Sequence, residues 1–268
     1  MGSRDKRIGA SKNQWIRGAI LMYWSIFWLF NIIDKVIGGS QFLWVGRDRF
    51  AQFQKFFASA GLEAPIIADV ALIIAAGLEV FAFVFFAGAL IYFLKNKTSE
   101  ARSWFLMGIC FTLATFTVFS LGDHLFGDRF ELLEHTLFWF MTLASWVIFI
   151  RLEDSVAGEE SGLERRQMMA AAVISGALIL ITTGSIFNYN EHFFYRRTAA
   201  ISAEPVGEDL FKVAFPFLGG STVFEKTIEQ FMEEHPSKRI DHIYTVPNPL
   251  RLKKADALIF YIITEEKL

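Results

Sequence analysis

The sequence predicts an all-α integral membrane bundle of five transmembrane helices, followed by a small extracytoplasmic α+β domain. Hydrophobic residues make up 53% of the 268-residue chain and include thirty Phe, whereas an average soluble domain is about 45–50% apolar. Upstream of residue 189 they gather in blocks of roughly twenty residues, the length needed to cross about 30 Å of hydrocarbon. Residues 189–268 instead alternate short apolar segments with charged ones.

Composition excludes several classes of function. The net charge of −2 argues against a nucleic-acid partner. The single Cys, Cys110, rules out an intrachain disulfide, a covalently attached haem and a Cys-ligated iron–sulfur cluster. The first apolar run is too long for a signal peptide and lacks a small-residue cleavage site, so we expect it to be retained as a membrane helix.

The N-terminal part is predicted as a cytoplasmic tail, residues 1–15, and a first membrane helix over about 15–37. Asp34 and Lys35 fall near the far end of this helix. In the segment that follows, four Phe recur at helical spacing: Phe50, Phe53, Phe56 and Phe57. This pattern predicts an amphipathic helix that lies in the membrane interface.

The next three spans are predicted over about 65–94, 104–121 and 132–150, and the first of them has Pro in its first turn. A polar linker, 152–167, precedes a fifth transmembrane helix, 168–188. The tail, the 95–102 loop and the linker, with Arg17 and Arg151, hold eleven Lys and Arg residues, against five in the opposite loops. The positive-inside rule then places the N-terminus in the cytoplasm of a multi-pass inner (plasma) membrane protein and the C-terminal domain in the periplasm.

The C-terminal domain, 189–268, is predicted to contain strands at 213–217, 240–246 and 257–264. Thr222 and Glu225 have the spacing of a capping box that opens a helix ending near residue 234. So short a domain has a thin core, and docking onto the membrane part or a partner would help to stabilise it.

The densest titratable cluster beside apolar segments lies at 119–138, between the third and fourth predicted spans. It contains Asp123, His124, Asp128, Arg129, Glu131, Glu134 and His135. Ionisable groups at the end of a membrane bundle are costly to bury and by default suggest a site. The first and third predicted spans end at the outer face and the fourth begins there. We therefore expect this cluster and Asp34-Lys35 to lie together at that face. The alternative is that most of these groups simply sit in headgroups and water.

A quinone headgroup needs hydrogen-bonding groups beside an apolar slot, and His with carboxylates at the membrane edge meets that need. The candidate catalytic residues are His124, His135, Glu134 and Glu79. The candidate cofactor-binding residues are Asp34, Lys35, Asp123 and Trp139. A structural hydrogen-bonding role, metal ligation and haem ligation remain open for the two His, because their spacing is diagnostic of none of these.

Glu79 lies in the middle of the otherwise apolar 65–94 segment. A carboxylate at that depth is protonated, paired or facing a polar cavity. Lys35 or Arg17 would serve as its partner. It is therefore a second candidate position, for proton transfer or for an interhelix bond.

Three segments together resemble the DoxX/DoxD superfamily of four-helix membrane proteins over about residues 16–151. They are FNIIDKVIGG, RFAQFQKFFASAGLEAP and AAGLEVFAFVFFAGAL. The resemblance implies a subunit similar to DoxD, the small subunit of thiosulfate:quinone oxidoreductase, which passes electrons from a reduced sulfur compound to quinone. The fifth helix with the C-terminal domain is similar in layout to a fused DoxA-like unit, a single-span protein with an extracytoplasmic domain.

The alternative is a non-catalytic accessory subunit of a larger respiratory, photosynthetic or other membrane complex. The chain has no redox-active Cys pair and no flavin fingerprint, which favours this alternative. The expected partners are other membrane subunits or a second copy, the lipid bilayer and, for the enzyme, a small anionic substrate.

Overall fold

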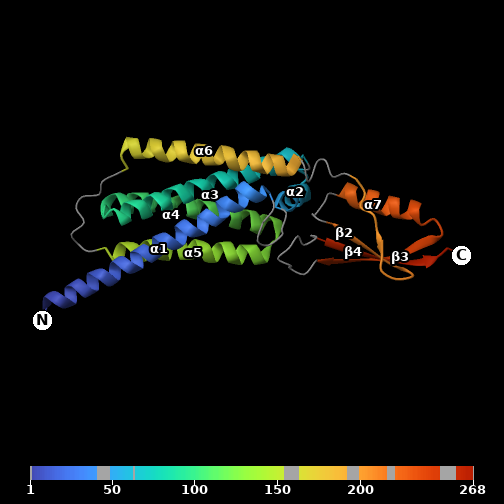
Figure 1. The fold of residues 1–268 in the computed structure, drawn as a ribbon, viewed down its shortest axis with the longest axis horizontal. Helices are drawn as coiled ribbons and strands as arrows, with labels where there is room; N and C mark the ends of the chain where they lie inside the picture. Colours follow the sequence, from blue (N-terminus) through green and yellow to red (C-terminus); the bar gives the residue numbers. More distant parts are fainter. Residues whose placement is uncertain are drawn as a thin grey trace. The chain divides into compact units, whose positions relative to one another are not determined.

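A computed structural model describes residues 2–40, 49–62, 64–153, 163–191, 199–215, 221–247 and 258–267. The chain divides into two compact units, which are treated separately here. The first comprises Met1–Ile33 and Ile73–Thr182, and the second comprises Asp34–Leu72 and Thr183–Leu268. Figure 1 shows the helices and strands of both units.

Five helices of the described residues are long and apolar enough to cross a membrane. The candidate spans are Lys12–Gly38 within α1 (Gly2–Gly38), then α3 (Pro65–Leu94), α4 (Thr98–Phe126), α5 (Arg129–Arg151) and α6 (Arg165–Tyr189). The protein is therefore a mostly helical, multi-pass membrane protein, as its hydropathy predicts. The short helix α2 (Arg49–Ser59) covers the predicted amphipathic segment.

Helix boundaries differ from those predicted, most at the start of α1 and at both ends of α4, which begins at Thr98. The helix α1 begins at Gly2, so the polar tail continues the first span as a helix. The helix α4 continues past residue 121 to Phe126, because its backbone hydrogen bonding ends only at the left-handed Gly127. Hydropathy identifies the residues that favour lipid. It does not show whether a helix continues into polar residues outside the lipid.

In the first unit, α1 contacts α3, α4 and α5. Trp28 Nε1 donates to Thr112 Oγ1 on α4 at 3.0 Å, and Trp24 Nε1 donates to Ser145 Oγ on α5 at 3.0 Å. The Trp24 ring also stacks on Phe86 of α3, with centroids 5.8 Å apart. Because hydrocarbon offers these indole N–H groups no acceptor, the interhelix bonds both satisfy the donors and fix the rotation of α1.

Aromatic pairs join the remaining neighbours of this bundle. Phe81 of α3 stacks on Phe111 of α4 with centroids 4.9 Å apart, and Phe105 of α4 lies 4.4 Å from Phe149 of α5. The four helices α1, α3, α4 and α5 thus form one aromatic-cored bundle (Figure 1). The side of α3 at Gly77 faces α6, where an added Cβ would lie 3.8 Å from Ile179 Cδ1.

The C-terminal domain contains the four strands β1 (Glu204–Pro205), β2 (Leu210–Phe215), β3 (Lys238–Pro247) and β4 (Leu258–Glu266), and the helix α7 (Ser221–Glu234). The sheet is antiparallel with strand order β1-β2-β4-β3. The helix and the three predicted strands are present, and β1 was not predicted. Residues 216 and 217 of the first predicted strand lie outside the described residues. The helix already includes Thr222, so this residue is not the cap that the sequence suggested.

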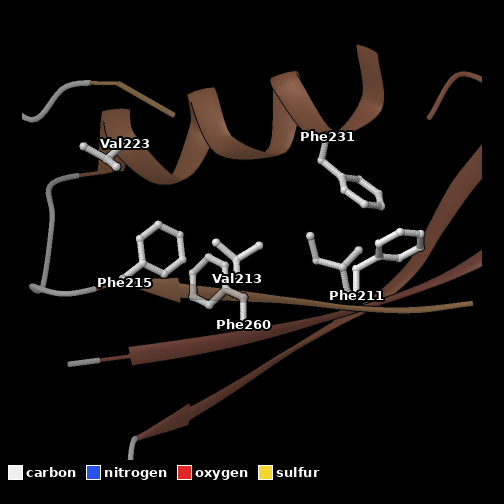
Figure 2. Close-up of a cluster of buried hydrophobic side chains, with 7 residues drawn as sticks. Phe211, Val213, Phe215, Val223, Phe231 and Phe260 are labelled. Carbon is white, nitrogen blue, oxygen red and sulfur yellow. The ribbon is translucent and has the colours of Figure 1, made fainter. Parts of the chain in front are cut away.

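The core of this domain lies between α7 and one face of the sheet (Figure 2). Phe211, Val213 and Phe215 alternate along β2, so all three side chains point to the helix-covered face. Phe260 of β4 lies 4.6 Å from Phe215 between ring centroids, and Phe231 of α7 lies 4.9 Å from Phe211. Few side chains fill this core, as expected for so small a domain.

Candidate functional site

A tight turn joins α4 to α5. Gly127 adopts φ 79° and its N–H donates to the Asp123 carbonyl, which also accepts from Asp128 N at 2.9 Å. Asp128 then caps α5, because its Oδ1 accepts from Glu131 N at 3.1 Å. The end of α4, this turn and the start of α5 are named the α4–α5 hairpin, and they bring residues of the predicted 119–138 cluster side by side.

The hairpin brings Asp123 and His135 into direct contact. His135 Nδ1 lies 2.6 Å from Asp123 Oδ2, and the Asp123 residue is 5% exposed. The His135 side chain is 20% exposed, and its ring centroid lies 5.1 Å from that of Phe119. Because the carboxylate accepts the Nδ1 hydrogen, it fixes the ring orientation and leaves Nε2 as the nitrogen available to a ligand. Among the described residues Nε2 has no hydrogen-bonding partner.

The other residues predicted for this cluster take different positions. His124 and Glu134 are exposed, whereas His135 is half-buried. Trp139 Nε1 donates to Thr117 Oγ1 at 3.1 Å, which joins α5 to α4 farther from the turn than the Asp123–His135 pair. Of the two predicted His, His135 is therefore the one that the fold orients.

Removing the cap of α5 is expected to loosen the hairpin. Asp128→Ala should cost about 1 kcal/mol of folding free energy, since the Glu131 N–H loses its acceptor. Asp128→Asn keeps an acceptor oxygen and is the matched control. The thermal unfolding midpoint of the two purified variants would measure the difference, and equal midpoints would show that the cap contributes nothing.

A second polar cluster lies in the other unit, where α1 ends and α2 begins. The guanidinium of Arg49 pairs with the Asp34 carboxylate, and their side chains are 7% and 3% exposed. Lys35 is 3% exposed. Asp34 and Lys35 were predicted to share a site with the hairpin residues. The structure places them in the second compact unit and gives Asp34 a buried ion pair, which supports a structural role for Asp34.

Further hydrogen bonds tie α1, α3 and α6 together in this unit. Asn190 Nδ2 donates to Asp69 Oδ1 at 2.5 Å, and Asn190 Oδ1 accepts from Ser40 Oγ at 2.6 Å. Ser185 Oγ of α6 donates to the Val36 carbonyl at 2.9 Å. The sequence analysis missed Asp69, Ser40 and Asn190. Asp69 alone carried a signal, as a carboxylate in the first turns of an apolar helix.

Glu79 is buried in α3, with 4% of its surface exposed. Arg17, one of the two partners considered for it, pairs with Glu153 at 3.2 Å and lies over the Phe149 ring at 4.1 Å. Within the part of the chain that the structure describes, no three His, Cys, Asp or Glu side chains are grouped so as to hold one metal ion.

The chain is a multi-pass helical membrane protein with a small α+β domain after its last span. No protein-family model matches it, and neither the curated proteins nor the solved structures contain a significant match.

Proposed function

We propose that this protein is the quinone-binding membrane subunit of a DoxD-like oxidoreductase, with the quinone headgroup held at His135. The observation that supports the proposal is the Asp123–His135 contact of 2.6 Å, which orients a half-buried imidazole whose Nε2 has no partner among the described residues. The bundle of α1, α3, α4 and α5 has the helix count that the DoxX/DoxD resemblance implies.

The residues around His135 fit a quinone headgroup. A quinone carbonyl needs a hydrogen-bonding partner beside apolar surface, and the His135 ring lies 5.1 Å from Phe119 and 6.0 Å from Phe116 between centroids. When bound, a quinone supplies the acceptor for two electrons and two protons. His135 would hold or pass a proton at Nε2, and Asp123 would keep the ring in the orientation that this transfer requires.

Oxidation of a reduced sulfur compound such as thiosulfate is assigned to the assembled complex, to which this chain contributes the quinone site. The proposed orientation places the N-terminus in the cytoplasm and the hairpin at the outer face. The excess of basic residues in the N-terminal tail, the 95–102 loop and the linker supports it.

The experiment measures binding of a short-chain quinone analogue to the purified chain in nanodiscs. His135→Gln is expected to weaken binding about tenfold, the equivalent of about 1.4 kcal/mol for one lost hydrogen bond. Asp123→Asn should weaken it similarly, because the ring loses its orienting carboxylate. The control is His242→Gln, which removes the His of an exposed Asp241–His242 pair, 3.1 Å apart, on β3.

The two outcomes separate the proposed functions. Unchanged affinity in both His135→Gln and Asp123→Asn would remove the quinone site from this hairpin. If the chain also co-purifies with a larger complex whose activity the two variants leave intact, the accessory-subunit alternative is correct.

A further inference from the structure

At the end of the bundle where α4 begins, basic side chains predominate. They include Arg17, Lys95, Lys97, Arg102 and Arg151, and the acidic ones beside them are Glu100 and Glu153. These five basic residues are named the basic end. The α4–α5 hairpin has the opposite balance, with Asp123, Asp128, Glu131 and Glu134 against Arg129. We propose that the basic end binds the phosphate headgroup of an anionic phospholipid.

One buried carboxylate organises the basic end. Glu153 pairs with Arg17 at 3.2 Å and with Arg102 at 3.6 Å, so two guanidinium groups share one negative charge. The Glu153 side chain is 8% exposed, whereas that of Arg102 is 30% exposed. The Arg102 guanidinium of this ion triad therefore lies partly at the protein surface.

The turn between α3 and α4 adds two lysines. Lys95 is exposed, and the Lys97 side chain is 55% exposed and lies 3.4 Å from Glu100. Arg151, at the end of α5, is also exposed. Each lies at or near the end of an apolar helix, so its aliphatic stem can lie along lipid while its charge reaches the headgroup layer.

A buried donor points to the same ligand. Trp104 is 6% exposed, and its indole Nε1 has no hydrogen-bonding partner among the described residues. Its benzene edge lies against Gly88, so Nε1 faces away from that contact. The Tyr92 ring lies 5.6 Å from the Trp104 ring and 6.0 Å from Lys97 Nζ, so Tyr92 lies between the Trp104 ring and one lysine of the basic end. A buried donor without an acceptor is costly, and a phosphodiester oxygen would satisfy it.

The ligand is a lipid because of where the charges lie. Leu94, the last residue of α3, is 71% exposed and belongs to an apolar span. The charges that follow are therefore at headgroup depth, and basic clusters between membrane helices at this depth bind anionic headgroups. A free phosphate has the same charge chemistry, and the experiment distinguishes it.

The test uses the full chain in nanodiscs of phosphatidylcholine, alone or mixed with phosphatidylglycerol, and native mass spectrometry of retained lipid. The unchanged chain should retain phosphatidylglycerol in preference to phosphatidylcholine. Lys95→Gln with Arg151→Gln should weaken this preference about fivefold for each charge removed. The control, Arg129→Gln with Lys226→Gln, changes the net charge equally at exposed positions elsewhere.

Trp104→Phe should lower retention of phosphatidylglycerol without any change in charge, which a diffuse surface potential would not predict. Equal lipid preference in the Lys95/Arg151 variant and in its control would overturn the proposal. Displacement of phosphatidylglycerol by added inorganic phosphate at low ionic strength would also overturn it, in favour of a free-anion site. Neither result depends on quinone binding at His135.

Discussion

Replacing Arg49 with Ala is expected to lower the free energy of unfolding by about 3–5 kcal/mol, because it leaves the Asp34 carboxylate buried without its guanidinium partner. In the native protein, Arg49 offsets the free-energy cost of removing the Asp34 carboxylate from water. Deleting one member of the pair removes that compensation, whereas the desolvation remains. The measurement is the thermal unfolding midpoint in detergent, followed by size-exclusion chromatography of the heated protein.

The matched control is Arg239→Ala. Arg239 also pairs with a carboxylate, that of Glu265, but these side chains are 70% and 45% exposed. Water screens such a pair, so the expected loss is below about 1 kcal/mol. The double variant Asp34→Asn with Arg49→Gln should recover part of the loss, since neither replacement side chain is charged. Similar losses for Arg49→Ala and Arg239→Ala would contradict this account of the pair.

Gly39→Ala is expected to destabilise the protein by about 2–4 kcal/mol. Gly39 follows α1 with φ 60°, and a left-handed conformation costs a non-Gly residue about 1–2 kcal/mol. The added Cβ would also lie 2.7 Å from the Ser185 carbonyl oxygen of α6, and forced overpacking typically costs about 1–3 kcal/mol. Glycine at this position lets the end of α1 approach the backbone of α6.

Gly61→Ala separates these two contributions. Gly61 has φ 79°, but an added Cβ would meet nothing within 4 Å among the described residues. The variant therefore carries the backbone strain alone and should lose only about 1–2 kcal/mol. The difference between the two unfolding midpoints measures the close approach, and equal midpoints would show that α6 moves away at little cost.

The membrane helices could be predicted because a span needs an apolar block of fixed length, whatever its tertiary contacts. The helical state of the N-terminal tail could not, because hydropathy detects burial in lipid and is silent on polar helices. The first strand of the C-terminal domain was predicted only from residue 213, so Phe211 of its core was missed, and β1 is too short to show any period.

Topology predicts that Asp123 and His135 belong to one cluster, because it brings the end of one span to the start of the next, but it does not predict their direct contact. Which of His124 and His135 meets Asp123 depends on how α4 and α5 are rotated about their axes. The sequence pattern does not show this rotation. The buried cluster of the second unit was harder to foresee. Its Ser40–Asn190 bond joins residues 150 positions apart, and neither residue type is rare in a loop or helix end.

The two indole bonds of α1 bear on how the bundle assembles. Trp24 and Trp28 are one helical turn apart, and they donate to hydroxyl groups on α5 and α4 respectively. Because α1 precedes α4 and α5 in the chain, its two donors are synthesised before either acceptor. Helices α4 and α5 are made later and then supply both acceptors, so the chain's order of synthesis matches an order of assembly in which α1 is the template.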